Sequence, residues 1–156
     1  MSKDPTKYKV IAQNKRARFE YEILETIEAG LVLVGSEVKS LRQGKTNLTD
    51  AFADDREGGL YLINLHIEEY KGANRFNHET KRPRKLLLHK KEQDKMLGVV
   101  QRKGLTLIPL TMYFNHKGIV KVTIGTCKGK KLHDKRATEK ERDWQRDKAR
   151  ILKGDV

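Results

Sequence analysis

The sequence predicts a mainly β protein, arranged as a small closed or partly open barrel and followed by a basic C-terminal tail. Short segments alternate between apolar and polar residues, turn residues join several of them as hairpins, and one segment has a clear helical pattern. Because helices do not alternate with strands, a parallel sheet is disfavoured. The 156 residues suit one domain plus an appendage, which we place at 1–130 and 131–156.

The first part of the chain is expected to hold two strands. The polar opening, to about Arg18, is predicted to be extended, and an alternating strand follows it. Ala29 and Gly30 are predicted to turn the chain into a second strand at 31–34. The next stretch, "LRQGKTN", is typical of a helical turn or loop. The apolar positions of the first strand are Phe19, Tyr21, Ile23 and Ile27.

Two hairpins and one helix are predicted over the rest of the body. "TDAFADDREGGLYLINLHIEEY" carries acidic residues and glycines where a hairpin turn needs them. "LLLHKKEQDKMLGVVQRKG" contains the helix, which Gly104 is placed to stop. "LTLIPLTMYF" and "GIVKVTIGTC" then form a hairpin about "NHKG", in which Pro109 indicates an edge strand or a bulge. The apolar residues at helical spacing are Met96, Leu97, Val99 and Val100.

Charge and cysteine content limit the classes of partner and site. Thirty-four Lys and Arg against 21 Asp and Glu give a formal charge of +13, which favours a polyanionic partner. The tail lacks the wide apolar face of an interfacial helix, so a membrane partner is disfavoured. Cys127 is the single cysteine, which excludes an intrachain disulfide and a thiolate metal cluster. With no signal core or membrane-length apolar run, we expect a cytoplasmic protein.

Catalytic chemistry is the weaker hypothesis. The 5 histidines are scattered, and no Walker loop or G-x-S-x-G motif is present. Asp54, Asp55 and Glu57 could form a metal-binding cluster, but in "ADDREGG" they are better explained as turn residues. We therefore expect no enzyme activity and no metal or cofactor. The histidines are His66, His78, His89, His116 and His133.

Two basic clusters in the body fit phosphate binding. In "HETKRPRKLLLHKK" the clustered cations could contact phosphate oxygens, or could form a solvated loop beside an apolar helix start at 86–88. In "GSEVKSLRQGKTN" the cations recur three residues apart, and the carboxylate of Glu37 could accept hydrogen bonds from a base edge or ribose hydroxyl. The cations are Lys81, Arg82, Arg84, Lys85, Lys90 and Lys91 in the first cluster and Lys39, Arg42 and Lys45 in the second.

The tail has the pattern of a binding segment. On a helix its cations form one stripe. Acidic residues three positions before the arginines would stabilise that helix by only about 0.2–0.5 kcal/mol per acid–arginine pair. An isolated helix of this kind is marginal in water, so we expect a tail that is disordered alone and helical when bound. The alternative is a charged segment that is simply solvated. Its solubility would not require the apolar residues Trp144, Ile151 and Leu152, which argue against this alternative. The stripe consists of Arg142, Arg146, Arg150 and Lys153.

Sequence blocks along nearly the whole chain resemble a known family. They are "NKRARFEYEI", "GSEVKSLRQGKTNL", "RKLLLHK", "KGKKLHDKR" and "DKARILK". In this order and at these separations they resemble the SsrA-binding protein family (small protein B), the bacterial partners of transfer-messenger RNA in trans-translation. The resemblance implies an antiparallel barrel of the oligonucleotide-binding (OB) type with small flanking helices. It also implies an RNA-binding adaptor that brings transfer-messenger RNA to stalled ribosomes for peptide tagging and ribosome rescue.

The resemblance further implies which residues contact RNA. The barrel would bind the tRNA-like domain, and the tail would enter the empty mRNA channel as a helix, with His133 against a base of the 16S rRNA decoding centre. Partners would be transfer-messenger RNA, both ribosomal subunits and elongation factor Tu, and not DNA. The implied barrel residues are Lys15, Arg16, Glu37, Lys39, Ser40, Arg42, Asn47, Arg84, Lys85, Lys128, Lys130 and Lys131. The implied tail residues are His133, Asp134, Lys135, Arg136, Ile151, Leu152 and Lys153, beside the arginine stripe.

Two other functions fit the same composition. A structural ribosomal protein would share the charge, the size and the basic tail, but would sediment with all ribosomes, stalled or not. An RNA-processing enzyme that uses the loop 54–57 would need a divalent metal and would lose activity when those carboxylates are replaced.

Overall fold

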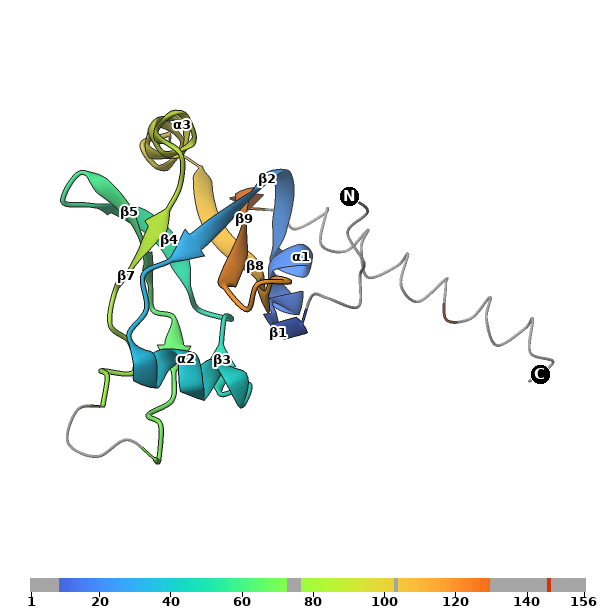
Figure 1. Ribbon diagram of the computed structural model, residues 1–156. Coiled ribbons are helices and arrows are strands. Elements are labelled where there is room, and N and C mark those ends of the chain that lie inside the picture. Colours follow the sequence, from blue (N-terminus) through green and yellow to red (C-terminus); the bar gives the residue numbers. More distant parts are fainter. Residues whose placement is uncertain (1–8, 73–76, 103, 130–145, 147–156) are drawn as a thin grey trace, which may run out of the picture.

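The computed structural model describes residues 9–72, 77–102, 104–129 and 146. Antiparallel strands predominate in these residues, and three short helices flank them (Figure 1). The elements are β1 Lys9–Gln13, α1 Lys15–Glu20, β2 Tyr21–Leu31, α2 Gly35–Arg42, β3 Thr46–Asn47, β4 Phe52–Arg56, β5 Gly59–Ile63, β6 His66–Ile67, β7 Arg84–Leu87, α3 Lys90–Val100, β8 Leu105–Phe114 and β9 Val120–Gly129. Of the predicted tail, only Arg146 lies within the described residues.

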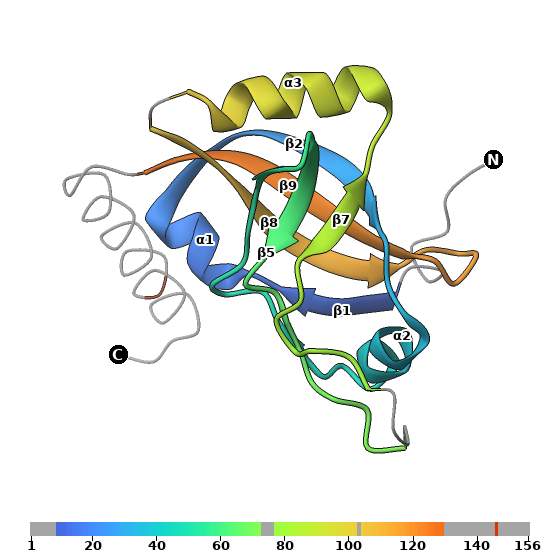
Figure 2. The same ribbon diagram turned by 90° about the vertical axis from the view of Figure 1, so that its left-hand side faces the viewer.

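The larger sheet closes on itself. Its strand order is β1-β8-β4-β5-β7-β2-β9, and β9 also pairs with β8, so the strands from β8 to β9 form a ring with β1 added beside β8. β3 and β6 form a separate two-stranded sheet. The helices α3 and α2 lie at opposite ends of the ring, and α1 lies beside β1 and β8 (Figures 1 and 2). The predicted mainly β class is confirmed, and ring closure leaves few strand edges exposed.

The strand β2 is longer than predicted, and the predicted turn at Ala29 and Gly30 is wrong. Ala29 pairs with Val122 of β9, and Gly30 pairs with Lys121 of β9 and with Leu87 of β7. The second strand predicted at 31–34 is also wrong, because β2 ends at Leu31. Pairing with two distant strands keeps the Ala-Gly step extended, which a local turn pattern could not predict.

The helix α1 was missed by the sequence analysis, which expected an extended segment to about Arg18. Its N-cap is Asn14, whose Oδ1 accepts a hydrogen bond from the Ala17 amide at 3.2 Å. The Asn14 amide group also donates to the carbonyls of Leu48 (3.3 Å) and Pro109 (3.2 Å). An asparagine before a short helix is a recognised cap, and here it also joins α1 to two distant segments.

Both predicted hairpins are present. The first turns at Glu57 and Gly58, whose φ angles of 54° and 77° fit the type I′ turn that matches strand twist. Asp54 and Asp55 belong to β4 and not to the turn itself. In the second hairpin the β8–β9 register shifts at Pro109, which is the bulge that the sequence analysis offered as one alternative.

The predicted helix is α3, and its apolar stripe faces the ring. Met96 is 2% exposed and Val99 is 7% exposed. The Glu92 side chain accepts a hydrogen bond from the His89 amide at 3.2 Å, so the helix begins at Lys90. It ends at Val100, and Gly104 follows with a positive φ of 87°.

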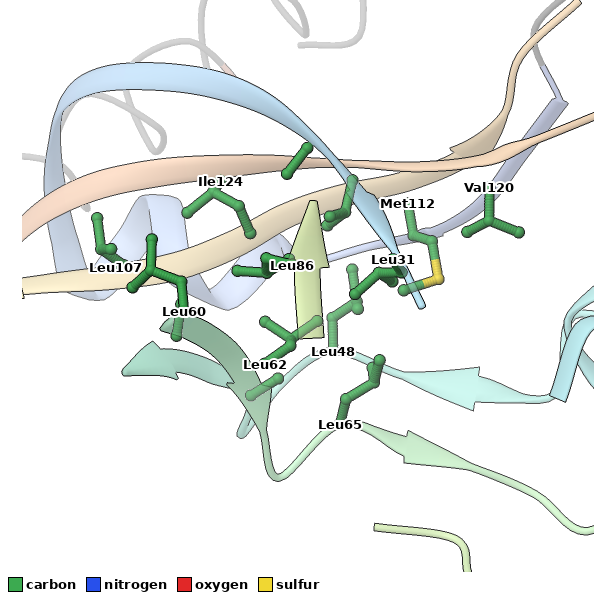
Figure 3. Packing of buried hydrophobic residues seen from close by; sticks show 14 of the residues in the cluster. Leu31, Leu48, Leu60, Leu62, Leu65, Leu86, Leu107, Met112, Val120 and Ile124 are labelled. Atoms are coloured by element: carbon green, nitrogen blue, oxygen red, sulfur yellow. The ribbon is translucent and has the colours of Figure 1, made fainter. Parts of the chain in front are cut away.

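A core of leucines and other aliphatic side chains fills the ring (Figure 3). Its members come from β2, from all the strands from β4 to β9, from α2 and α3, and from the segments around Leu48 and Leu65. A smaller cluster lies under α1 and contains Cys127, and burial raises the pKa of this thiol to about 11. The thiol therefore stays protonated at neutral pH and packs as an apolar group. None of the helices in the described residues is both long and apolar enough to span a bilayer.

Candidate nucleic-acid interface

A buried ion-pair group joins α2 to the segment that leads into β7. The Oε1 atom of Glu37 accepts a hydrogen bond from Arg82 Nη2 at 2.5 Å, and its Oε2 accepts one from Arg84 Nε at 2.5 Å. Glu37 Oε1 also accepts from the Val34 amide at 2.9 Å, which holds the first turn of α2. The side chains of Glu37 and Arg84 are both 0% exposed, whereas that of Arg82 is 32% exposed, so this group, which we call the Glu37 node, is buried except at Arg82.

Arg84 extends the Glu37 node to two more segments. Its Nη1 donates to the Leu65 carbonyl, and its Nη2 donates to the carbonyls of Glu79 (3.3 Å) and Thr80 (3.2 Å). A planar guanidinium can satisfy several acceptors at fixed angles. The donors of Arg84 are thus directed into the protein and not toward a ligand.

His78 adds a second connection between α2 and the segment that leads into β7. Its Nε2 lies 2.9 Å from the Ile67 carbonyl, and its Nδ1 lies 2.9 Å from the hydroxyl of Ser36 in α2. The carbonyl can only accept, so Nε2 donates, and in the neutral ring Nδ1 accepts from the Ser36 hydroxyl. His78 is 6% exposed and therefore acts as a structural side chain here.

The charges of the Glu37 node are coupled. Burial by itself would raise the pKa of Glu37, but the hydrogen bonds from Arg82 and Val34 and the charge of Arg84 outweigh it and lower that pKa below its ordinary value. Burial lowers the pKa of the Arg84 guanidinium, and Glu37 opposes this change. Glu37 is therefore a carboxylate at neutral pH and neutralises a cation that has no access to water.

Burial corrects part of the expected RNA-facing set. Glu37 and Arg84 are 0% exposed and Ser40 is 1% exposed, so these side chains cannot contact a macromolecule on the surface. The physical reason is that Glu37 and Arg84 compensate each other's charge inside the protein, where each needs the other. Glu37 and Arg84 instead hold α2 against β7.

The other expected barrel residues lie at or near the surface. Lys39 is exposed, with Nζ 5.6 Å from the centre of the Tyr70 ring. Arg16 is exposed and forms an ion pair with Glu20 at 2.8 Å. The remaining exposed members are Lys15, Arg42, Asn47, Lys85 and Lys128. Lys130 and Lys131 lie outside the described residues, as do His133, Asp134, Lys135, Arg136, Arg142, Arg150, Ile151, Leu152 and Lys153.

A groove on the outside of the ring was not predicted from the sequence. It crosses β2 at Gly30, has a volume of about 480 Å³, and has side chains of β7, α3 and β9 along its sides. A Cβ atom at Gly30 would come within 3.4 Å of the Leu87 side chain and 3.8 Å of Lys121 Nζ. Because glycine has no side chain, the groove is deeper at Gly30 than it would be with any other residue there. The lining residues are Glu28, Gly30, Leu87, Leu88, His89, Glu92 and Lys121.

Exposed apolar side chains lie beside cations on this face. Leu87 is 53% exposed and Val32 is 44% exposed. Lys85 pairs with Tyr61 across the β5–β7 ladder, and Lys121 is the β9 partner of Gly30. Apolar or aromatic surface bordered by lysines can take stacked bases and their phosphates together. We call this area, with the groove at its centre, the Gly30 face.

A sequence signal for the Gly30 face exists in "RKLLLHK". Side chains alternate in a strand, so Leu86 and Leu87 must face opposite sides if the segment is extended. The local pattern of the sequence instead favours a helix start at 86–88, in which an outward-facing leucine is not expected. Leu86 is 1% exposed and belongs to the core, and Leu87, on the opposite side of the strand, is 53% exposed.

The Glu37 node leads to a stability prediction. Glu37→Gln keeps the shape but leaves Arg84 as an uncompensated buried cation, so we expect the free energy of unfolding to fall by about 3–5 kcal/mol at pH 7. The pKa of Glu37 is lowered by folding, so its contribution is complete above the unfolded pKa of about 4.3 and is lost as the pH falls through the lower folded value. Urea unfolding of both proteins at pH 7 and at acid pH measures this difference.

Glu25→Gln is the matched control for this prediction. Glu25 forms an exposed ion pair with Lys95, with about half of each side chain in solvent, and such pairs contribute only about 0.2–1 kcal/mol. If the two substitutions cost the same, or if the effect of Glu37→Gln does not shrink at acid pH, the Glu37 node does not have the role described.

Comparisons with known proteins agree with the resemblance. The family model described as SmpB protein matches residues 11–154. The chain is 57% identical over 145 residues to the SsrA-binding protein of Rhodopseudomonas palustris (strain BisB18), covering 93% of this chain and 92% of that protein. It is 55% identical over 152 residues to the SsrA-binding protein of Bradyrhizobium sp. (strain ORS 278), covering 97% of each.

A solved structure is similar in fold and in sequence. It is described as "tmRNA-SmpB: a journey to the center of the bacterial ribosome", and it superposes with a TM-score of 0.66 at 53% identity, over 79% of this chain and 85% of that one. The family match and the relatives' identities each extend over most of the sequence. This chain therefore belongs to the SmpB family, the SsrA-binding proteins.

Proposed function

We propose that this chain is an RNA-binding adaptor that binds the tRNA-like domain of transfer-messenger RNA and brings it to stalled ribosomes for trans-translation. The Gly30 face carries the proposal, because it joins exposed apolar side chains, a low glycine floor and lysines on one side of the ring. The relatives named as SsrA-binding proteins and the related structure of tmRNA with SmpB support the choice of this RNA. The proposed activity is binding and delivery in the cytoplasm, without catalysis.

On the Gly30 face, each kind of side chain has a separate task. Leu87 and Val32 would contact base or ribose surface, while Lys85 and Lys121 would contact phosphate oxygens. Contacts to bases and shape favour one RNA over another, whereas phosphate contacts add affinity that depends on salt. His89, at the start of α3 and on the edge of the groove, could donate or accept a hydrogen bond at a base edge.

The exposed residues of the expected set would extend the contact. Arg42 and Lys39 lie on α2, whose orientation depends on the Glu37 node. We propose direct RNA contacts for the surface members of the set and a positioning role for Glu37, Ser40 and Arg84. The proposed direct contacts are Lys15, Arg16, Lys39, Arg42, Asn47, Lys85, Lys128, Lys130 and Lys131.

The tail would carry out the second half of the function. We assign RNA binding to residues 1–130 and ribosome binding to residues 131–156, with the tail entering the empty mRNA channel and folding there as a helix. His133 would stack on a decoding-centre base, with 134–136 beside it, and the arginine stripe and 151–153 would contact rRNA along the channel. Elongation factor Tu would accompany the complex, as the family resemblance implies.

Leu87→Ala tests the Gly30 face directly. We expect the affinity for the tRNA-like domain to fall about tenfold, because the substitution removes apolar surface whose burial contributes about 0.8 kcal/mol per CH₂ group. Leu24→Ala is the matched control, since Leu24 is 52% exposed on the same strand as Gly30 but outside the groove. Competition binding against bulk tRNA measures both variants, and equal effects of the two would show that the Gly30 face is not the site.

Lys121→Ala separates the phosphate contact from the apolar one. We expect weaker binding at every salt concentration and a slope of log affinity against log salt that is smaller by about 1. Leu87→Ala should leave that slope unchanged, because leucine releases no counterion. An unchanged slope for Lys121→Ala would remove this lysine from the interface.

Deletion of residues 131–156 tests the division of labour. Affinity for the tRNA-like domain should stay nearly intact, because the proposed contacts lie mainly in the body. Peptide tagging in a reconstituted translation system should be abolished, because the ribosome would not accept the complex without the tail. An equal loss of RNA affinity would mean that the tail is only an electrostatic anchor.

A further inference from the structure

We propose that a second pocket, between α1 and the segment 49–52, holds one unpaired guanine of an RNA strand. The inference rests on the proposed function, because it assumes an RNA partner, but it concerns a site separate from the Gly30 face. The pocket has a volume of about 250 Å³. That is smaller than the roughly 300–1,000 Å³ of pockets for drug-sized ligands, which suits a single planar ring system.

The pocket has a fixed frame. Asn14 lines it and joins α1 to the carbonyls of Leu48 and Pro109, so its two sides are held together by hydrogen bonds at 3.2–3.3 Å. The small side chains of Ala17 and Ala51 are buried at its base. A site held in this way needs little ordering to receive a ligand.

Its walls fit a base. Tyr21 and Phe52 are half-buried lining residues, and Ile108 is a buried one. Aromatic side chains are the surfaces on which proteins stack unpaired bases. Arg16 lies at the rim, where its ion pair with Glu20 holds the guanidinium in place for a cation–π contact or a phosphate.

Asp50 selects guanine among the bases. Its side chain lines the pocket and is exposed, and its charge is close enough to Arg16, on the rim of the same pocket, to interact with it. A carboxylate offers two acceptors side by side and no donor. Guanine presents two neighbouring donors on its Watson–Crick edge, N1–H and the N2 amino group, and adenine does not.

The location separates this pocket from the Gly30 face. Tyr21 and Gly30 lie at opposite ends of β2, roughly 30 Å apart along an extended strand. Tyr21 pairs with Gly129, and Lys128 pairs with Glu22, so the pocket lies where the chain leads into the basic tail. From Lys128 to Val156 the sequence has 11 basic and 6 acidic residues, a net of +5. An RNA strand attracted to the tail would therefore pass this pocket.

The experiment compares two labelled pentanucleotides, UUGUU and UUAUU, bound to the full-length protein and followed by fluorescence anisotropy at one salt concentration. We expect UUGUU to bind at least fivefold more tightly, as a good bidentate pair to a base edge allows. Asp50→Asn introduces a donor that opposes guanine, so the two affinities should become equal. Asp55→Asn, an exposed aspartate of β4 outside the pocket, should keep the preference.

Two results would overturn the inference. One is equal affinity of the wild type for both pentanucleotides, as expected if the pocket takes a protein side chain or nothing. The other is a guanine preference that survives Asp50→Asn. Binding of the tRNA-like domain, measured on the same preparations, distinguishes this failure from failure of the proposed function. Only in the latter case would the wild type lose its preference for transfer-messenger RNA over bulk tRNA.

Discussion

The ion pairs of the Glu37 carboxylate, buried between Arg82 and Arg84, are the interaction on which the proposed RNA-binding surface depends. It connects α2, the segment after residue 77 and β7, and through Arg84 it reaches the Leu65 carbonyl. Each charge is costly without its partner, so the group is either complete or strongly destabilising. The cations of α2 and the exposed residues of β7 are therefore held in one fixed relation, although none of the three charged side chains needs to touch RNA.

A second constraint is the continuity of β2. Because Gly30 lies within the strand and pairs on both sides, β2 links β7 to β9 and closes that part of the ring. The same glycine gives the outer face its low floor, so closure of the fold and formation of the groove have one origin. The other end of β2 meets α1, where Asn14 holds the second pocket together. The two proposed RNA contacts thus lie at the two ends of one strand.

Local patterns in the sequence were sufficient for the hairpins, for α3 and for the mainly β class, because turn residues and side-chain periodicity act over a few positions. They failed where distant pairing decides: Gly30 looked like a turn, and Leu87 looked like part of a helix start. Residue type also gave a wrong expectation for Glu37 and Arg84, which were expected to face RNA but are buried. A charged residue in a basic cluster resembles a surface residue until its partner, 47 positions away, is known. The cap at Asn14 was a local signal for α1 that could have been used.

We infer that a rigid, shaped surface recognises one RNA, and that charge alone does not account for binding. The most direct test is the affinity of the full-length protein for transfer-messenger RNA, with bulk tRNA as competitor, over a series of salt concentrations. We expect overall affinity to fall as salt rises while the preference for transfer-messenger RNA is retained. Loss of that preference at high salt, with affinity following salt alone, would show instead that the protein binds polyanions without selecting this RNA.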